Sequence, residues 1–284
     1  MRLMHNLASL NIFRNYTKTL QRQSGAIGKI SSGYKVNSAS ESPNDLAKSE
    51  RMRIQIRGLN MASRNAQDGV SMLQTAEGGL ENMTSMLTRM RELAVRYGND
   101  TNTDNDKKII ETELSQLVEG YDEICNNTEF NGVNLLNTDK ELEMPVGSNV
   151  GETVKFNTYK LDSTSIKDKN GDVINLNDLS KISEKSISAG EAIEKIDKAM
   201  TTVVSVRSKY GAIENRFEGV MNKLNEIGER VQGAESQVRD VDIAEEMMNF
   251  SRDNILVEAS NAMMVQSNKF PQDILRILEN VKSR

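Results

Sequence analysis

Residues 188–242 read SAGEAIEKIDKAMTTVVSVRSKYGAIENRFEGVMNKLNEIGERVQGAESQVRDVD, and apolar side chains recur along this stretch in a heptad pattern. A heptad repeat keeps one stripe of a helix facing a partner helix, as in a coiled coil. Ser188 and Glu191 have the spacing of a capping box at its start. We therefore predict one long helix that needs a partner of similar length. Its two interleaved apolar series are Ile196, Val203, Tyr210, Phe217, Leu224, Val231 and Val238, and Ala192, Ala199, Val206, Ile213, Val220, Ile227, Ala234 and Val241.

Residues 44–97 carry a second heptad pattern of nearly the same length. Two long helices with an equal apolar period are the simplest partners for each other. The small residues Ala62, Ala66, Gly69 and Ala76 would allow their close approach. The remaining apolar positions of this stretch are Met52, Leu59, Leu73, Leu80, Met83, Leu87, Met90, Ala94 and Tyr97.

Further helices are predicted on both sides of these two. Residues 1–34 are apolar at helical spacing and end at Gly33, and a third helix begins near Asp104. After the heptad stretch the chain continues as a helix to about Met264, and a last helical piece follows Pro271.

Residues 137–187 differ from the rest of the chain. Runs such as 153–161 and 173–176 alternate or are β-branched, which predicts one or two β-hairpins. Residues 168–172 resemble part of a calcium-binding loop, but the glycine stands two places early and Leu179 occupies the position that requires glutamate. We interpret that segment as a plain turn.

The expected fold is therefore mainly α, a long antiparallel helical bundle or coiled coil of N- and C-terminal helices with a small β-hairpin piece in the middle. Three parts are predicted. Residues 1–42 with 243–284 form a terminal coiled-coil layer, residues 43–136 with 188–242 form the helical bundle core, and residues 137–187 form a small β-rich outer segment.

Composition excludes several classes of protein. The 284 residues include 37% apolar and 4% aromatic residues, with a net charge of -5 and no basic block that suggests nucleic acid. No run of about 18 apolar residues exists to span a membrane, and the N-terminal residues lack the apolar stretch of a secretory signal peptide. Nucleic acid and membrane are thus not expected as partners.

Enzymatic chemistry is not expected either. The sequence lacks phosphate-binding loops, a dinucleotide-binding glycine pattern, metal-ligand spacings and a Ser-His-Asp set, so no catalytic residue, cofactor or metal is predicted. The single cysteine, Cys125, follows Val118 and Tyr121 on one helical face and is assigned to packing, because the single histidine, His5, lies far away in the sequence.

The terminal helices have apolar stripes but too few neighbours within one chain to bury them. Copies of the chain stacked in a tube would cover these stripes, and contacts that are head-to-tail need not close and can grow into a helix. The predicted self-assembly residues are Leu7, Leu10, Phe13, Leu20, Ile27, Met248, Ile255, Ala259 and Met263.

Several long strings resemble one family. Residues 30–37 read ISSGYKVN and resemble the LSSGxRIN string of bacterial flagellins. Residues 234–248 read AESQVRDVDIAEEMM and resemble the C-terminal signature of the same family. Further similar strings lie at residues 52–60, 62–69, 74–78, 89–95 and 128–132, and together the resemblance covers about residues 25–135 and 188–278.

The resemblance implies the extracellular subunit of the bacterial flagellar filament, in a short form with little outer domain. It implies export through the flagellar export channel without a cleaved signal peptide. The implied partners are other copies of the chain, an export chaperone, and cap and hook-associated proteins.

In flagellins that a vertebrate Toll-like receptor recognises, the matching positions are Arg89, Leu93 and Glu113. The alternative is that Arg89 and Glu113 are ordinary exposed charges and that Leu93 packs in the core. Other functions stay open beside the filament subunit: a hook–filament junction protein, a secreted filamentous adhesin or immune ligand, and a flagellin with an enzymatic insert, against which the absence of a His-Glu-x-x-His motif speaks.

Overall fold

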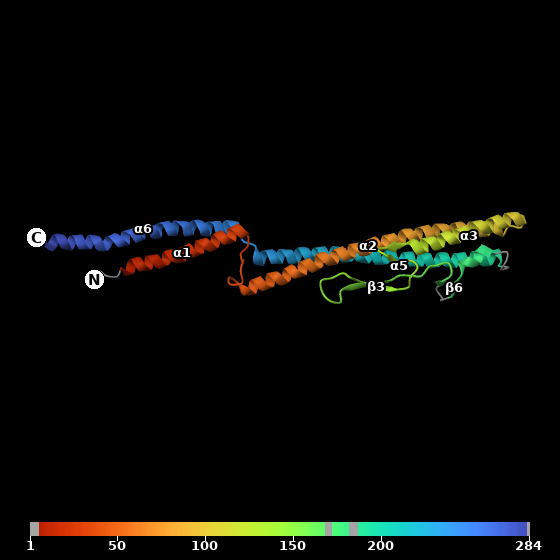
Figure 1. Ribbon diagram of the computed structural model, residues 1–284, viewed down its shortest axis with the longest axis horizontal. Helices are drawn as coiled ribbons and strands as arrows, with labels where there is room; N and C mark the ends of the chain where they lie inside the picture. Colours follow the sequence, from red (N-terminus) through yellow and green to blue (C-terminus); the bar gives the residue numbers. More distant parts are fainter. Residues whose placement is uncertain (1–5, 168–171, 182–186, 283–284) are drawn as a thin grey trace. The chain divides into compact units, whose positions relative to one another are not determined.

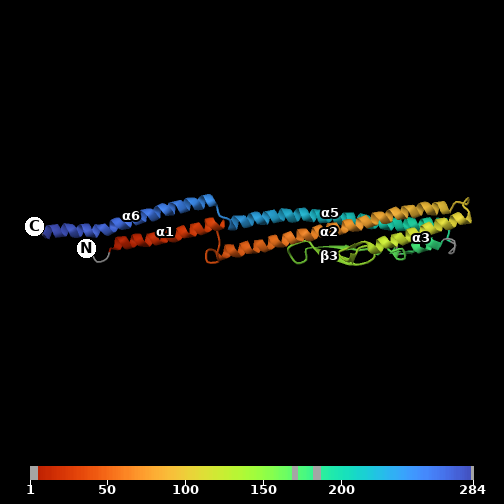
Figure 2. The same ribbon diagram turned by 45° about the horizontal axis from the view of Figure 1, so that its top comes forward.

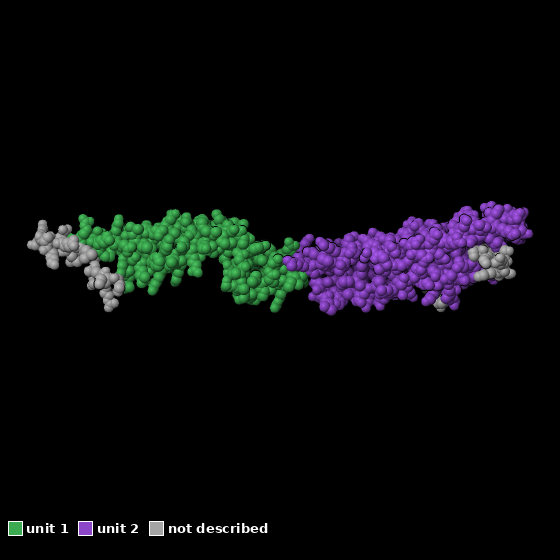
Figure 3. Space-filling model, in the orientation of Figure 1, with its two compact units in different colours: residues 1–55, 230–284 green, residues 56–229 purple. Residues whose placement is uncertain are grey.

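The structure is a computed structural model that describes residues 6–167, 172–181 and 187–282. Five α-helices dominate the described residues (Figure 1): α1 (Leu7–Ser32), α2 (Pro43–Tyr97), α3 (Asp104–Asn127), α5 (Ala189–Arg239) and α6 (Ile243–Lys282). The predicted mainly α fold is confirmed. The chain divides into two compact units (Figure 3), a terminal unit of residues 1–55 and 230–284 and a central unit of residues 56–229.

Helix starts in the structure follow local capping chemistry. The capping box before α5 is confirmed, because Glu191 N donates to Ser188 Oγ at 3.2 Å and Ser188 N donates to Glu191 Oε2 at 3.3 Å. Thr103 and Asp106 form the equivalent box before α3. These boxes satisfy backbone donors that a helix start leaves unpaired, so both helices begin at defined residues.

In the central unit, α2, α3 and α5 share one apolar core, and the two views in Figures 1 and 2 show them side by side. Gly69 marks a close approach of α2 to α5 and to strand β3 (Glu141–Pro145). A Cβ placed on it would lie 2.9 Å from Met144 Sδ and 3.0 Å from Phe217 Cζ. The large fully buried side chains of this core are Leu80, Met83, Leu87, Met90, Leu93, Leu114, Tyr121 and Phe217.

The heptad series of α5 is not buried along its whole length. Burial is complete at positions such as Val203 and Phe217, but Ile227 is exposed and Val231 and Val238 are half-buried. The heptad pattern thus predicts the helix but overstates how much of its stripe one chain can cover.

Three short antiparallel strand pairs follow α3. They are β1 (Glu129–Phe130) with β2 (Val133–Asn134), β3 (Glu141–Pro145) with β4 (Thr153–Asn157), and β5 (Ile166–Lys167) with β6 (Val173–Ile174), and a 3₁₀ helix, η1 (Leu176–Lys181), comes next. Asn131 and Gly132 both have positive φ in the turn between β1 and β2, a hairpin that lies before the predicted β segment. Residues 168–171 of the segment interpreted as a plain turn lie outside the described residues.

The described part of residues 137–187 packs into the core of the central unit. Val154, Phe156, Leu161, Ile166 and Leu176 are buried in the same apolar cluster as the three helices. The physical reason is that strands this short cannot bury an apolar face without a helix to pack on.

In the terminal unit, α1 and α6 pack side by side in both views (Figures 1 and 2). The sequence suggested an unbroken helix through residue 242, but the structure interrupts it between Arg239 and Ile243, where Tyr34 and Asp240 form a β-bridge. The expected break near Pro271 is wrong, because α6 continues through this proline. A proline removes one backbone donor from a helix and can bend it without ending it.

Candidate assembly surface

The apolar side chains of α1 and α6 lie on the outside of the terminal unit. Leu7 is 63% exposed, Met248 is 68% exposed and Ile255 is 65% exposed. All nine residues predicted for self-assembly are exposed: Leu7, Leu10, Phe13, Leu20, Ile27, Met248, Ile255, Ala259 and Met263. We call this set the terminal stripe. A soluble chain rarely leaves so many large apolar groups in water unless a partner covers them.

The contact between α1 and α6 includes several polar pairs. Asn6 Nδ2 donates to the Ser267 carbonyl at 2.8 Å, and Gln23 Nε2 donates to Asn254 Oδ1 at 3.1 Å. As the number of one partner rises the other falls, so the two helices run antiparallel. Further ion pairs join Arg22 to Asp253 at 3.5 Å and Lys29 to Glu246 at 3.8 Å.

Few side chains are buried between these two helices. Thr19 and Ala26 are the buried residues of α1, and Asp253 is the buried residue on the facing part of α6. A groove of about 640 Å³ runs beside them and is lined by Asn15, Lys18, Thr19, Gln21, Arg22, Leu256 and Ser260. The two helices therefore bury few side chains against each other and leave the nine residues of the terminal stripe exposed.

A cluster around Arg239 joins the end of α5 to α2 and to the connector between α1 and α2, within the terminal unit. Arg239 Nη1 donates to Glu50 Oε1 at 3.1 Å and to Ser49 Oγ at 3.2 Å, and its guanidinium lies 4.6 Å from the centroid of the Tyr34 ring. The hydrogen bond from Arg239 is the main reason that the pKa of Glu50 lies below its ordinary value. Sequence reasoning missed this cluster, because its members come from three separate stretches of the chain.

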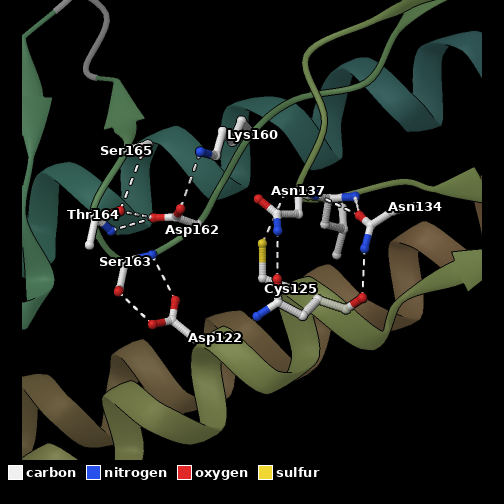
Figure 4. Close-up of polar contacts among 11 residues, drawn as sticks. Asp122, Cys125, Asn134, Asn137, Lys160, Asp162, Ser163, Thr164 and Ser165 are labelled. Atoms are coloured by element: carbon white, nitrogen blue, oxygen red, sulfur yellow. Dashed lines mark hydrogen bonds and ion pairs between the residues drawn. The ribbon is translucent and has the colours of Figure 1, made fainter.

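A second polar cluster anchors the described strands to α3 in the central unit (Figure 4). Asp122 accepts hydrogen bonds from Ser163 N at 2.8 Å and from Ser163 Oγ at 2.6 Å, and the labelled side chains point toward each other. Cys125 is fully buried, and its thiol donates to the Leu136 carbonyl at 3.0 Å. This places the cysteine in the core, as the sequence indicated.

The three candidate receptor contacts lie in different environments. Arg89 and Glu113 are joined across α2 and α3 by an ion pair of 2.7 Å, and Arg89 also pairs with Glu92 at 3.0 Å. Leu93 is only 1% exposed and belongs to the apolar core. The two charged groups are accessible to a partner, whereas the leucine side chain is occupied by packing.

The described residues were also compared with the requirements of a metal site and of a membrane span. Within residues 6–167, 172–181 and 187–282, no three His, Cys, Asp or Glu side chains are grouped to hold a metal ion. Nor is any helix in the described part long and apolar enough to cross a membrane. Among the described residues, the terminal stripe is the most distinctive surface of this mainly α-helical protein.

Comparison with known proteins identifies the family. The model of the bacterial flagellin N-terminal helical region matches residues 3–141, and that of the C-terminal helical region matches residues 193–278. The flagellin of Halalkalibacterium halodurans is 42% identical over 96% of this chain and 98% of its own length. The flagellin of Bacillus subtilis is 37% identical over 98% of this chain and 100% of its own length. The chain therefore belongs to the bacterial flagellin family, whose members are structural subunits of the flagellar filament.

Solved structures show related folds. A putative flagellar hook-associated protein from Vibrio parahaemolyticus aligns with a TM-score of 0.61 at 17% identity, over 70% of this chain and 100% of that chain. The crystal structure of Bacillus cereus flagellin is 29% identical, covers 57% of this chain and 88% of that chain, and aligns with a TM-score of 0.47. The hook-associated protein thus shares the fold of this chain.

Proposed function

We propose that this chain assembles head-to-tail with copies of itself into the tubular flagellar filament by burying the terminal stripe. The observation that carries the proposal is that the packing of α1 against α6 leaves the apolar side chains of the terminal stripe exposed. Each Å² of apolar surface removed from water contributes roughly 25 cal/mol. Contacts between unlike surfaces of neighbouring copies do not close on themselves, so growth continues as a helical polymer.

Truncation tests this proposal. Deletion of residues 1–34, or of residues 245–284, removes one half of the terminal stripe and leaves residues 56–229 intact. We expect each truncated protein to keep a helical circular dichroism spectrum and to remain in the supernatant after seeding with filament fragments. Normal filaments from either truncated protein would contradict the proposal.

Point variants separate the stripe from its surroundings. Ile255→Gln places a polar side chain in the stripe, whereas Arg252→Gln changes an exposed residue on the same helix that bonds Asn249 of that helix at 2.9 Å. Ile255→Gln should lower the seeded yield of sedimentable filament, and Arg252→Gln should not. Electron microscopy of the product also tests the junction-protein alternative, because a junction protein would stop at a short ring.

We expect the chain to reach the extracellular filament through the flagellar export channel, without cleavage of a signal peptide. The support is the similarity to flagellins along nearly the whole chain. An export chaperone and the cap and hook-associated proteins are the partners that this route implies. A strain without the export channel should retain the protein in the cell, and secretion from that strain, or a shortened N-terminus in purified filaments, would contradict this route.

Recognition by a vertebrate Toll-like receptor is a further proposal for the pair Arg89 and Glu113. Both side chains are partly exposed and joined by an ion pair of 2.7 Å. Arg89→Ala should reduce receptor signalling in a reporter assay, whereas Arg216→Ala, at another exposed arginine of the central unit, should leave it unchanged. Full signalling from the Arg89→Ala protein would remove Arg89 from the contact.

A further inference from the structure

We propose that Arg239 is the positioning residue that fixes the register of α1 against α6, so that the two halves of the terminal stripe are presented in one arrangement. The inference rests on the proposed assembly function for its importance. Its evidence is separate, because the cluster around Arg239 contains no residue of the stripe.

The α1–α2 connector and the α5–α6 connector are joined next to Arg239. Lys35 N donates to the Arg239 carbonyl at 2.7 Å, and Val241 N donates to the Gly33 carbonyl at 3.1 Å. Tyr34 and Asp240 form the β-bridge between these two bonds. Because the bridge lies one residue beyond Gly33 and three residues before Ile243, it defines where α6 starts relative to the end of α1.

The Arg239 side chain holds this bridge from one side. Only 16% of the side chain is exposed, and Nη1 bonds Ser49 and Glu50 of α2 at 3.2 Å and 3.1 Å while the guanidinium covers the Tyr34 ring. Glu235, one turn earlier on α5, lies 3.9 Å from the same Nη1. One planar cation thus contacts the connector, the start of α2 and its own helix, a set of contacts that lysine cannot reproduce.

The contact between α1 and α6 has few fully buried side chains to fix its register. Those side chains are small or polar, and the half-buried ion pair of Lys29 with Glu246 is long, at 3.8 Å. Coiled coils with few distinguishing interior side chains slip along their repeat unless one specific polar contact fixes them. The contacts of Arg239 with Tyr34, Ser49 and Glu50, which we call the clamp, provide that specific contact at the end of α1 and the start of α6.

Disulfide trapping measures the register directly. Gln23 and Asn254 touch at 3.1 Å, so Gln23→Cys with Asn254→Cys reports the native register, and Gln23→Cys with Asn261→Cys reports a shift of one heptad. Cys125 is buried and hydrogen-bonded, so it does not compete for oxidation. In the otherwise unaltered full-length chain, the native pair should form at least about tenfold faster than the shifted pair.

Arg239→Gln should reduce this preference by about tenfold, as expected when a charged hydrogen bond is lost, and Arg239→Lys should have an intermediate effect. Arg252→Gln serves as the control and should leave the ratio unchanged. Tyr34→Leu should shift the ratio in the same direction, and its effect should not add to that of Arg239→Gln because both remove one contact.

The proposal is overturned if Arg239→Gln keeps the trapping ratio within about twofold of the unaltered chain, or if Arg239→Gln and Tyr34→Leu act additively. Filament formation is not the readout, so failure of the assembly proposal and failure of the clamp give different results. Ile255→Gln should block filament growth and leave the trapping ratio native. Assembly would then depend on the terminal stripe, and the register of α1 against α6 would be set outside the stripe, as the clamp requires.

Discussion

At the scale of the residue, burial decides the chemistry of Cys125. The thiol has no exposed surface and donates to the Leu136 carbonyl. Burial raises the pKa of the thiol from its ordinary value of 9.0 to about 12, because the thiolate is poorly solvated in the core. The side chain therefore behaves as a small apolar group at physiological pH.

Cys125 should be inert toward thiol reagents in the folded chain. At pH 8 we expect modification to be at least about 100-fold slower than in denaturant, since it requires transient opening of the core. Because the folded pKa is raised, the stability that this thiol contributes is fully present below pH 9.0 and is lost as the pH rises toward about 12. Equal modification rates in the folded and denatured chains would contradict the buried placement.

Asp122 ties the segment after β4 to α3, and its loss should weaken the central unit. Asp122→Ala leaves the buried backbone N–H and hydroxyl of Ser163 without their acceptor, which should cost about 1–3 kcal/mol of unfolding free energy. Glu123→Ala changes the exposed neighbour on the same helix and should cost much less. Denaturant melts of the two variants test this, and equal stabilities would show that Asp122 is not an anchor.

At the scale of the element, heptad pattern and capping chemistry predict most of the helices. The capping box at Ser188 predicted the start of α5. Gly33, with a φ of 75°, caps the C-terminus of α1 and ends the helix as expected. Pattern alone did not reveal the break between Arg239 and Ile243, because the apolar repeat continues across it and the break depends on hydrogen bonds from a distant connector. It likewise could not show that strands β3 to β6 pack on the helices.

Two glycines of α2 give a matched test of the helix packing. Gly78 has no atom within 4 Å of an added Cβ, so Gly78→Ala should stabilise the helix by about 0.5–1 kcal/mol. Gly69→Ala brings the same propensity gain but forces the new methyl against Met144 and Phe217, which should make it less stable than Gly78→Ala by about 1–3 kcal/mol. Equal effects of both substitutions in thermal melts would mean that α2 and α5 do not approach closely at Gly69.

At the scale of the whole molecule, helical spacing in the sequence indicated which apolar residues of the terminal helices would be exposed. It did not indicate which contacts would hold α1 and α6 together. The nine stripe residues were chosen from helical spacing, and all nine are exposed. The contact between α1 and α6 also uses polar pairs, formed by Asn6, Gln23 and Arg22. Polar pairs of this kind have no periodic signature, so spacing alone could not reveal them.

The most direct test of the account follows methionine oxidation in the soluble chain and in filaments. Met248 and Met263 of the stripe are exposed, whereas Met83 and Met90 are fully buried in the central unit and serve as internal controls. With hydrogen peroxide and mass spectrometry, the account predicts that Met248 and Met263 oxidise rapidly in the soluble chain and at least about tenfold more slowly in filaments, while Met83 and Met90 stay slow in both. Equal oxidation of Met248 and Met263 in the two states would contradict burial of the terminal stripe on assembly.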